Sequence, residues 1–278
     1  MLIRNTIQIT GSLEKPILLD ITYLDNANQK PVVIFCHGFK GFKDWGLFNA
    51  TAEQFAKSGF LFVKFNFSYN GTTAENPTEF VDLNAFGNNN YSIELNDLEN
   101  VIHWVLNSEY IAKQIDNEKI YLIGHSRGGG ISIIKSAENK IIKKLITWAS
   151  VSYFDRSIPE SHLEQWKKEG VYYIFNSRTN QQMPLFYQFY ENFSANKQRL
   201  DILARAKEVN IPTLVVHGTA DETVPVSEAN QLTDSISEAQ CLVIEKASHT
   251  FDVTHPFTSK EIPTNFQRVI DESIRFLL

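Results

Sequence analysis

The stretch "IGHSRGGG", residues 123 to 130, decides the fold. It follows an apolar run and ends in three glycines, each of which costs roughly 0.5–1 kcal/mol relative to alanine inside a helix. Gly124 and Gly128 complete the pattern Gly-x-Ser-x-Gly, in which a serine occupies a sharp turn between a strand and a helix. We therefore expect Ser126 in a strained backbone conformation, with Gly124 and Gly128 leaving room for the turn. Gly129 and Gly130 are expected to let the helix approach the sheet closely.

Strand-like and helix-like segments alternate on both sides of this turn. Apolar runs of strand length occupy residues 31–38, 59–67, 119–126, 143–150, 211–218 and 239–247. Amphipathic stretches of helical length occupy residues 47–58, 91–107, 127–138 and 226–236. This alternation predicts an α/β fold with a mostly parallel, doubly wound sheet. Residues 2–10 and 16–24 are closer to an apolar/polar alternation and predict an antiparallel hairpin at one edge, and residues 262–278 predict a final helix.

Residues 150–207 interrupt the alternation. They hold eleven of the 34 aromatic residues, which suggests a packed insertion instead of a flexible linker. Within it, "PESHLEQWKKEG" predicts a short helix ended by Gly170, and "VYYIFNSRTNQQMP" predicts a hairpin. We expect a single domain over residues 1–278 with this segment as a cap. Its aromatic side chains could line a substrate pocket or form the core of the cap itself.

Composition excludes several classes of function. With 26 basic and 32 acidic residues the 278-residue chain has a formal net charge of −6, which gives no reason to expect nucleic acid or an anionic membrane as a partner. The first residues lack a signal-peptide pattern, and no apolar run approaches the roughly 20 residues of a membrane span. Cys36 and Cys241 lie in apolar runs, so we expect buried, unreactive thiols and a cytoplasmic protein. No histidine and carboxylate group has metal-ligand spacing, so no metal is expected.

A serine nucleophile needs a base and an acid that orients the base. His249 follows the last strand-like run, and Asp221 follows the run that ends near His217, which gives the chain order Ser126, Asp221, His249. Asp252 is the alternative acid, but it lies outside the post-strand loop "HGTADETVP". His37 and His217 precede glycines at strand ends and are interpreted as structural residues. His125 is expected to pack beside the nucleophile.

The motifs "CHGFKGFKDW", "IGHSRGGG", "HGTADETVP" and "ASHTF" resemble those of the α/β-hydrolase family, in particular its dienelactone-hydrolase-like and cinnamoyl or carboxylesterase-like branch. They span residues 36 to 251 in the family's order. The resemblance implies the α/β-hydrolase fold with an inserted cap, and an oxyanion hole formed by the backbone N–H groups of Phe39 and Arg127. Asn66 stands where many relatives carry an aspartate. Ser126 argues against dienelactone hydrolases proper, which use cysteine, and against the branches that use aspartate.

The residues and the resemblance together predict a serine hydrolase that cleaves carboxylic esters through an acyl-enzyme, with aromatic acyl esters among the candidate substrates. Its partner would be a small-molecule ester, and no cofactor is expected. A peptidase or an acyl-CoA thioesterase with the same three residues is the alternative. A non-catalytic ligand receptor on the same fold is a second alternative, but such a protein would be expected to lack one of the three residues.

Overall fold

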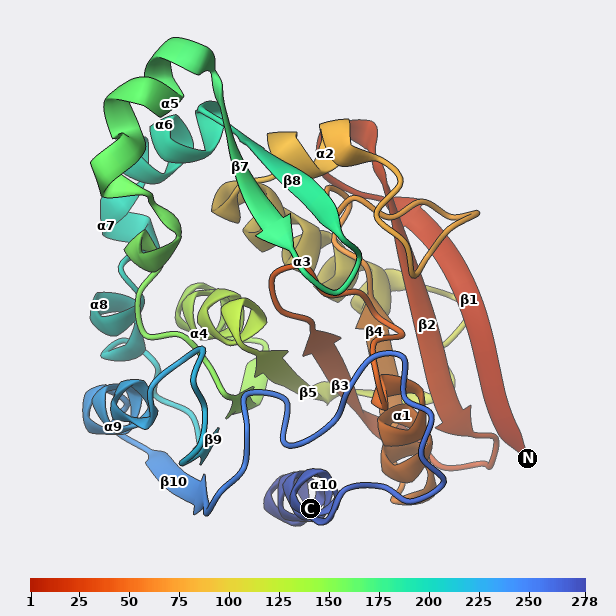
Figure 1. Ribbon diagram of the computed structural model, residues 1–278. Coiled ribbons are helices and arrows are strands. Elements are labelled where there is room, and N and C mark those ends of the chain that lie inside the picture. Colours follow the sequence, from red (N-terminus) through yellow and green to blue (C-terminus); the bar gives the residue numbers. More distant parts are fainter.

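The computed structural model describes residues 1–278 and is organised around one eight-stranded sheet (Figure 1). The spatial order is β1-β2-β4-β3-β5-β6-β9-β10. The strands are β1 (Leu2–Thr10), β2 (Pro16–Leu24), β3 (Lys30–Cys36), β4 (Leu61–Phe65), β5 (Ile115–His125), β6 (Ile142–Trp148), β9 (Thr213–Gly218) and β10 (Ala239–Ile244). In this order, all neighbouring strands from β4 through β3, β5, β6 and β9 to β10 pair in parallel, whereas β1 pairs antiparallel with β2 and β2 with β4. The mostly parallel sheet and the antiparallel edge hairpin are therefore confirmed.

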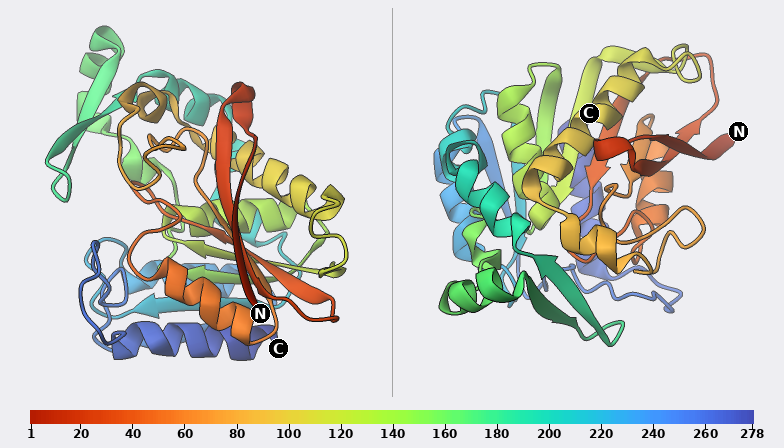
Figure 2. Two further views of the ribbon diagram at one scale, coloured as in Figure 1. Left: turned by 90° about the vertical axis from the view of Figure 1, so that its right-hand side faces the viewer. Right: turned by 90° about the horizontal axis from the view of Figure 1, so that it is seen from above.

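Helices cover both faces of the sheet (Figures 1 and 2). Helices α1 (Phe48–Lys57) and α10 (Thr264–Leu277) lie on one face. Helices α3 (Tyr91–Asn107), α4 (Arg127–Glu138) and α9 (Val226–Ser235) lie on the other. The expected ranges of α3 and α4 agree with the structure residue for residue, and the other helices and the strands differ at their ends. The doubly wound arrangement predicted from the alternation is thus confirmed.

The two faces of the sheet belong to two separate cores. Along β3, Val33 and Phe35 join the cluster that contains α1 and α10, whereas Val32 and Ile34 join the cluster that contains α3 and α4. Successive side chains of a strand point to opposite faces, so a strand covered on both sides must be apolar at consecutive positions. This is why the central strands read as continuous apolar runs in the sequence.

The segment between β6 and β9 contains the interruption seen in the sequence. It forms η2 (Asp155–Ser157), η3 (Glu160–His162), α5 (Leu163–Glu169), β7 (Val171–Asn176), β8 (Gln181–Phe186), α6 (Gln188–Ala195), α7 (Lys197–Leu200) and α8 (Ile202–Ala206). As expected, Gly170 ends α5 in a left-handed conformation (φ 75°), and β7 and β8 form an antiparallel hairpin. Phe154, Trp166 and Phe189 are buried in the main core, whereas Tyr173 and Phe175 are exposed.

The insertion is held to a second segment about 100 residues earlier in the chain, which includes α2 (Leu83–Asn88). The Gln188 side-chain amide donates to the carbonyl oxygens of Gly87 and Asn89, at 3.3 and 3.0 Å. The Gln181 amide donates to the carbonyl oxygen of Phe80 at 3.0 Å. Figure 1 shows the β7–β8 hairpin and α2 side by side.

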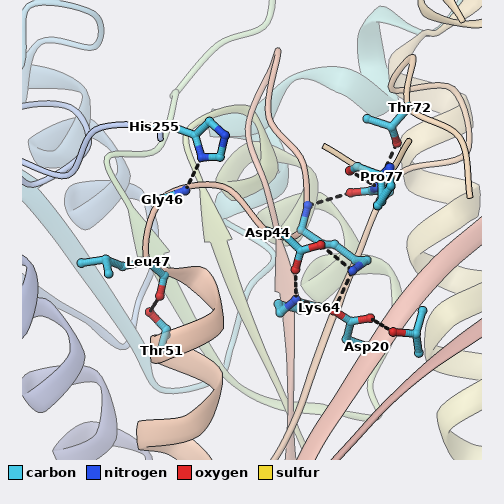
Figure 3. Close-up of polar contacts among 12 residues, drawn as sticks. Asp20, Asp44, Gly46, Leu47, Thr51, Lys64, Thr72, Pro77 and His255 are labelled. Carbon is cyan, nitrogen blue, oxygen red and sulfur yellow. Dashed lines mark hydrogen bonds and ion pairs between the residues drawn. The ribbon is translucent and has the colours of Figure 1, made fainter. Parts of the chain in front are cut away.

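Four charged side chains form a buried ionic cluster where the loop after β3 meets β2 and β4 (Figure 3). Asp20 and Lys64 are register partners across β2 and β4, and Lys43 and Asp44 come from the loop. Lys43 Nζ lies 2.7 Å from Asp20 and 2.6 Å from Asp44, and Lys64 Nζ contacts the same two carboxylates. Burial alone would raise the pKa of Asp20, but the two lysines outweigh it and lower that pKa. The cluster therefore ties this loop to the sheet with balanced charge.

The two cysteines differ in exposure, and one of the two expectations about them is wrong. Cys36 is buried, and burial raises the pKa of its thiol to about 12. Cys241 is exposed, contrary to the expectation, because its strand β10 is at the edge of the sheet, where three of its six residues are exposed. No helix combines the length and apolar character needed to cross a bilayer.

Candidate active site

Ser126 lies on the turn between β5 and α4, with φ 56° and ψ −120°. A positive φ is unusual for a residue with a side chain and indicates backbone strain that the surroundings must maintain. Neither neighbouring glycine could carry a side chain. A Cβ atom on Gly128 would lie 2.4 Å from the carbonyl oxygen of Cys36, and a Cβ atom on Gly124 would lie 2.3 Å from the carbonyl oxygen of Gly128. The strained turn expected from the motif is therefore present.

Gly129 and Gly130 are needed for two different close approaches. A Cβ atom on Gly129 would collide with Ser150, just beyond β6, at 2.3 Å from its Oγ. A Cβ atom on Gly130 would collide with Ile202 in α8 and with Phe154 in the insertion, at 2.7 and 2.9 Å. The expectation that Gly130 allows close packing against the sheet was wrong, because two parts of the insertion, α8 and the segment around Phe154, cover this side of α4.

The structure brings Ser126, His249 and Asp221 together at the carboxyl ends of the parallel strands. His249 Nε2 lies 3.0 Å from Ser126 Oγ, and His249 Nδ1 lies 2.8 Å from Asp221 Oδ2. Ser126 follows β5, Asp221 follows β9 and His249 follows β10, so residues 28 to 123 positions apart meet in one line. This geometry allows the imidazole to accept the serine proton while the carboxylate orients the ring.

Asp221 is fixed by four surrounding groups. Its Oδ1 accepts the backbone N–H groups of Thr223 and Val224 at 2.9 and 2.8 Å, and its Oδ2 lies 3.2 Å from His217 Nε2 in addition to His249. Burial alone would raise the pKa of Asp221, but the hydrogen bonds from His217 and His249 outweigh it and lower that pKa. The carboxylate is therefore ionised at neutral pH. The role of His217 in holding it, beside its bond to the Val224 carbonyl at 2.8 Å, was not foreseen.

The competing candidates lie in other interactions. Asp252 accepts hydrogen bonds from the Ser248 backbone N–H and the Asn265 side chain, whereas His249 Nδ1 is bonded to Asp221. His125 is partly buried beside His249, with ring centroids 5.0 Å apart, and donates to the His249 carbonyl oxygen at 3.1 Å. His37 is buried at the end of β3 and donates to the Gly38 carbonyl oxygen at 2.9 Å. Burial lowers the pKa of His37 to about 4 and that of His125 to about 3, so both stay neutral.

The loop after β3 lies directly beside Ser126. A Cβ atom on Gly38 would be 2.9 Å from Ser126 Cβ, so the next residue, Phe39, is adjacent to the nucleophile. The Phe39 N–H donates to no backbone or side-chain acceptor. Arg127 is the first residue of α4, where an N–H has no partner within the helix. The loop is held by the ionic cluster and by Asn66, whose Oδ1 accepts the Lys43 N–H at 2.6 Å.

A cavity of about 230 Å³ contains Ser126. The insertion contributes five of its residues: Val151, Phe154, Arg156, Ser157 and Ile174. The rest of the wall consists of Phe39, Tyr91, Ser126, Arg127, Thr223 and Val224. Of the eleven aromatic residues in the insertion, Phe154 alone reaches this cavity. A larger cavity of about 430 Å³ lies within the insertion, shares Phe154 with the first, and contains none of Ser126, Asp221 and His249.

Sequence reasoning missed a buried polar group next to the nucleophile. Glu94 in α3 and Asn89 before it lie beside the Arg127 side chain, with Glu94 Oε1 3.4 Å from Arg127 Nη1 and 2.7 Å from Asn89 Nδ2. A glutamate among the apolar positions of α3 is the signal that could have indicated it. No group of three histidine, cysteine, aspartate or glutamate side chains is placed to hold a metal ion.

Comparison with known proteins identifies the family. The model of the alpha/beta hydrolase fold family matches residues 31–169, half of the chain. This chain belongs to the alpha/beta hydrolase fold family. A curated relative, 2-hydroxy-6-oxononadienedioate/2-hydroxy-6-oxononatrienedioate hydrolase 1 of Pseudomonas putida, is 21% identical over 89% of this chain and 92% of its own length.

Solved structures share the fold of this alpha/beta hydrolase over its whole length. Est1E from Butyrivibrio proteoclasticus superposes with a TM-score of 0.69 at 16% identity, covering 98% of this chain and 97% of Est1E. The dienelactone hydrolase from Anabaena variabilis superposes with a TM-score of 0.65 at 14% identity, covering 99% and 96%. The expected resemblance to esterase-like and dienelactone-hydrolase-like members is thereby confirmed at the level of fold.

Proposed function

We propose that this alpha/beta hydrolase is a serine carboxylic-ester hydrolase with Ser126 as nucleophile, His249 as general base and acid, and Asp221 as the orienting carboxylate. The observation that carries the proposal is the unbroken line from Ser126 Oγ through the His249 ring to Asp221 Oδ2, at 3.0 and 2.8 Å. A serine held on a strained turn at a helix start, with a base within hydrogen-bond distance, is the arrangement that acyl transfer requires.

In the first half of the reaction, His249 Nε2 takes the Ser126 proton as Oγ attacks the ester carbonyl. The negative charge that develops on the carbonyl oxygen would be received by the N–H groups of Phe39 and Arg127, which have no other acceptor. The ionised Asp221 stabilises the imidazolium. The imidazolium then gives its proton to the departing alcohol, which leaves Ser126 acylated.

In the second half, a water molecule gives a proton to His249 and attacks the acyl-enzyme. The tetrahedral intermediate again places its charge on the carbonyl oxygen, and its collapse returns the proton from His249 to Ser126 Oγ. Every proton is thus carried by one imidazole. The sequence of steps requires no cofactor and no metal.

The insertion acts in this proposal as a cap over the reacting serine, because Phe154, Arg156, Ser157 and Ile174 form part of the cavity wall. The substrate is a small-molecule ester. The Pseudomonas relative bears the name of a hydrolase, and Est1E has been solved with ferulic acid bound, which supports the choice of reaction class. The exposed, unpaired Cys241 fits a reducing compartment such as the cytoplasm.

A fluorophosphonate probe tests the proposal directly. We expect labelling of the native protein at Ser126, found by peptide mass spectrometry, and loss of labelling in Ser126→Ala and His249→Ala. Native protein that is not labelled, or Ser126→Ala protein labelled as strongly as the native one, would contradict the proposal. A panel of p-nitrophenyl esters, feruloyl esters, aminoacyl anilides and acyl-CoAs then separates esterase from peptidase and thioesterase, since turnover of anilides or acyl-CoAs alone would replace the ester assignment.

A further inference from the structure

The cavity at Ser126 has an unusual charge for a protein with a formal net charge of −6. Two arginines, Arg127 and Arg156, line it together with the hydroxyl-bearing residues Tyr91, Ser157 and Thr223, and it has no aspartate or glutamate in its wall. The larger cavity in the insertion is different, because Asp155, Glu160 and Asp201 line it with a single lysine. Positive charge is therefore concentrated where the reaction is proposed to occur.

Arg156 is already committed to partners within the protein. Its Nη1 lies 2.6 Å from Oε1 of the buried Glu228, and its Nη2 donates to the Thr223 carbonyl oxygen at 2.7 Å. Its charge is thus compensated at short distance. Arg156 is the natural control for any statement about Arg127.

Arg127 is buried without close acceptors. Its nearest partners are Glu94 Oε1 at 3.4 Å and Ser157 Oγ at 3.5 Å, both at the long limit of a hydrogen bond. The guanidinium carbon lies over the Phe39 ring, 3.9 Å from its centroid, which is within the range of a cation–π contact. The guanidinium has five N–H donors, and the Arg127 side chain is only 6% exposed. Most of these donors therefore have no close acceptor.

Glu94 does not supply the missing acceptors. Its Oε1 already accepts from Asn89 Nδ2 at 2.7 Å, and its Oε2 is buried without any partner. Burial raises the pKa of Glu94, and this effect exceeds the lowering by Arg127. The guanidinium of Arg127 thus faces the cavity with its charge only partly compensated.

We propose that the Ser126 cavity selects esters that carry a second, free carboxylate, and that the Arg127 side chain is the group that binds it. The inference rests on the proposed function and specifies the substrate class of the same site. A planar carboxylate matches the two-pronged geometry of guanidinium, and a hydrogen bond between charged groups in a desolvated site is among the stronger ones in proteins. A cavity of about 230 Å³ suits a compact acid of this type.

The test compares two esters of the same shape. One is the mono-p-nitrophenyl ester of adipic acid, whose second carboxylate is free, and the other has that carboxylate replaced by the primary amide. We expect the native enzyme to favour the acid in kcat/KM, and Arg127→Met to lower the ratio of acid to amide by about ten- to a hundredfold. Arg127→Met keeps the backbone N–H, so the proposed oxyanion donor is retained.

Two further variants test the inference through the same acid-to-amide ratio: one should raise the ratio and the other should leave it nearly unchanged. Glu94→Gln removes the competing carboxylate and should raise the acid-to-amide ratio, whereas Arg156→Met should change it by less than about threefold. A purely structural role of Arg127 would lower both substrates together and leave the ratio unchanged, which would overturn the inference. Equal use of the acid and the amide by the native enzyme would overturn it as well.

The native enzyme also provides a test that needs no variant. Adipate should inhibit hydrolysis of the neutral amide ester competitively, and the acid's advantage should decrease as salt is added. Inhibition by inorganic phosphate without inhibition by adipate would replace the carboxylate by a phosphate-bearing substrate. If the fluorophosphonate probe labels Ser126 but the ratio fails these tests, this inference alone is wrong. If Ser126 is neither labelled nor needed, the proposed function is wrong too.

Discussion

The ionic cluster of Asp20, Lys43, Asp44 and Lys64 makes a quantitative prediction about stability. Asp44→Asn keeps the shape of the side chain but leaves Lys43 and Lys64, whose side chains are 5% and 1% exposed, to share Asp20 alone. Removing one partner of a buried ion pair costs about 3–5 kcal/mol, because a buried charge is left uncompensated. Asp44 itself is 16% exposed, which places the cost at the lower end, about 3 kcal/mol.

Restoring the charge balance should recover stability. The double variant Lys64→Met with Asp44→Asn leaves one pair, Lys43 with Asp20 at 2.7 Å, and no surplus charge. Replacement of buried ion pairs by uncharged groups is often close to neutral, so at least half of the loss should return. The sum of the two single losses should therefore exceed the loss in the double variant by about 2 kcal/mol or more.

Urea unfolding monitored by tryptophan fluorescence, with thermal unfolding as a second probe, measures all four proteins of this cycle. For a chain of this size about 3 kcal/mol corresponds to a decrease in Tm of roughly 6–12 °C. Thr6→Val, which removes the exposed 2.8 Å hydrogen bond to Asp20 without changing any charge, is the control. Additive losses, with the double variant as unstable as the two single variants combined, would refute the reasoning.

The remaining predictions concern the orienting carboxylate and acid sensitivity. Asp221→Asn should lower kcat about 10⁴-fold in steady-state ester hydrolysis by favouring the wrong tautomer of His249, whereas Asp252→Asn, measured in parallel, should stay near the native rate; the reverse ranking would make Asp252 the acid. Burial lowers the pKa of His37 to about 4, well below its ordinary value of 6.5. Between these values the unfolded chain binds a proton at His37 that the folded chain does not, so His37 alone should lower the free energy of unfolding by on the order of 2 kcal/mol from pH 7 to pH 5, in addition to the similar effect of His125. Urea unfolding of the native protein and His37→Gln at both pH values measures this, and an unchanged pH dependence in the variant would exclude His37 as the source.

The sequence predicted those parts of the fold that repeat a strong local pattern. The ranges expected for α3 and α4 were right because each contains at least three turns with a consistent apolar face or follows a recognisable turn. Helices α7 and α8, of four and five residues, were missed because so short a segment shows no periodicity. Cys241 was placed wrongly because an apolar run does not reveal that its strand lies at the edge of the sheet.

Candidate site residues were predictable where a motif marks the end of a strand. Ser126, Asp221 and His249 each follow a strand-like run, so the parallel sheet brings them to the same edge. No motif marks residues that meet only through the packing of two helices. The contact between Glu94 and Arg127 is of this kind, because it depends on how α3 packs against α4. Lys64 and Asp20 did leave a signal, since each is the one charged residue of its strand, and register then pairs them.

The attachment of the insertion to the segment around α2 has a consequence for how such proteins change over time and in the laboratory. Gln181 and Gln188 hold backbone carbonyls of residues 80, 87 and 89, and Phe186 packs where a side chain on Gly87 would have to go. A recombinant that exchanges residues 150–207 alone would bring new side chains against an old surface and leave those carbonyls without donors. Residues 80–90 and the insertion are therefore expected to change together in evolution, and chimeras should exchange both segments.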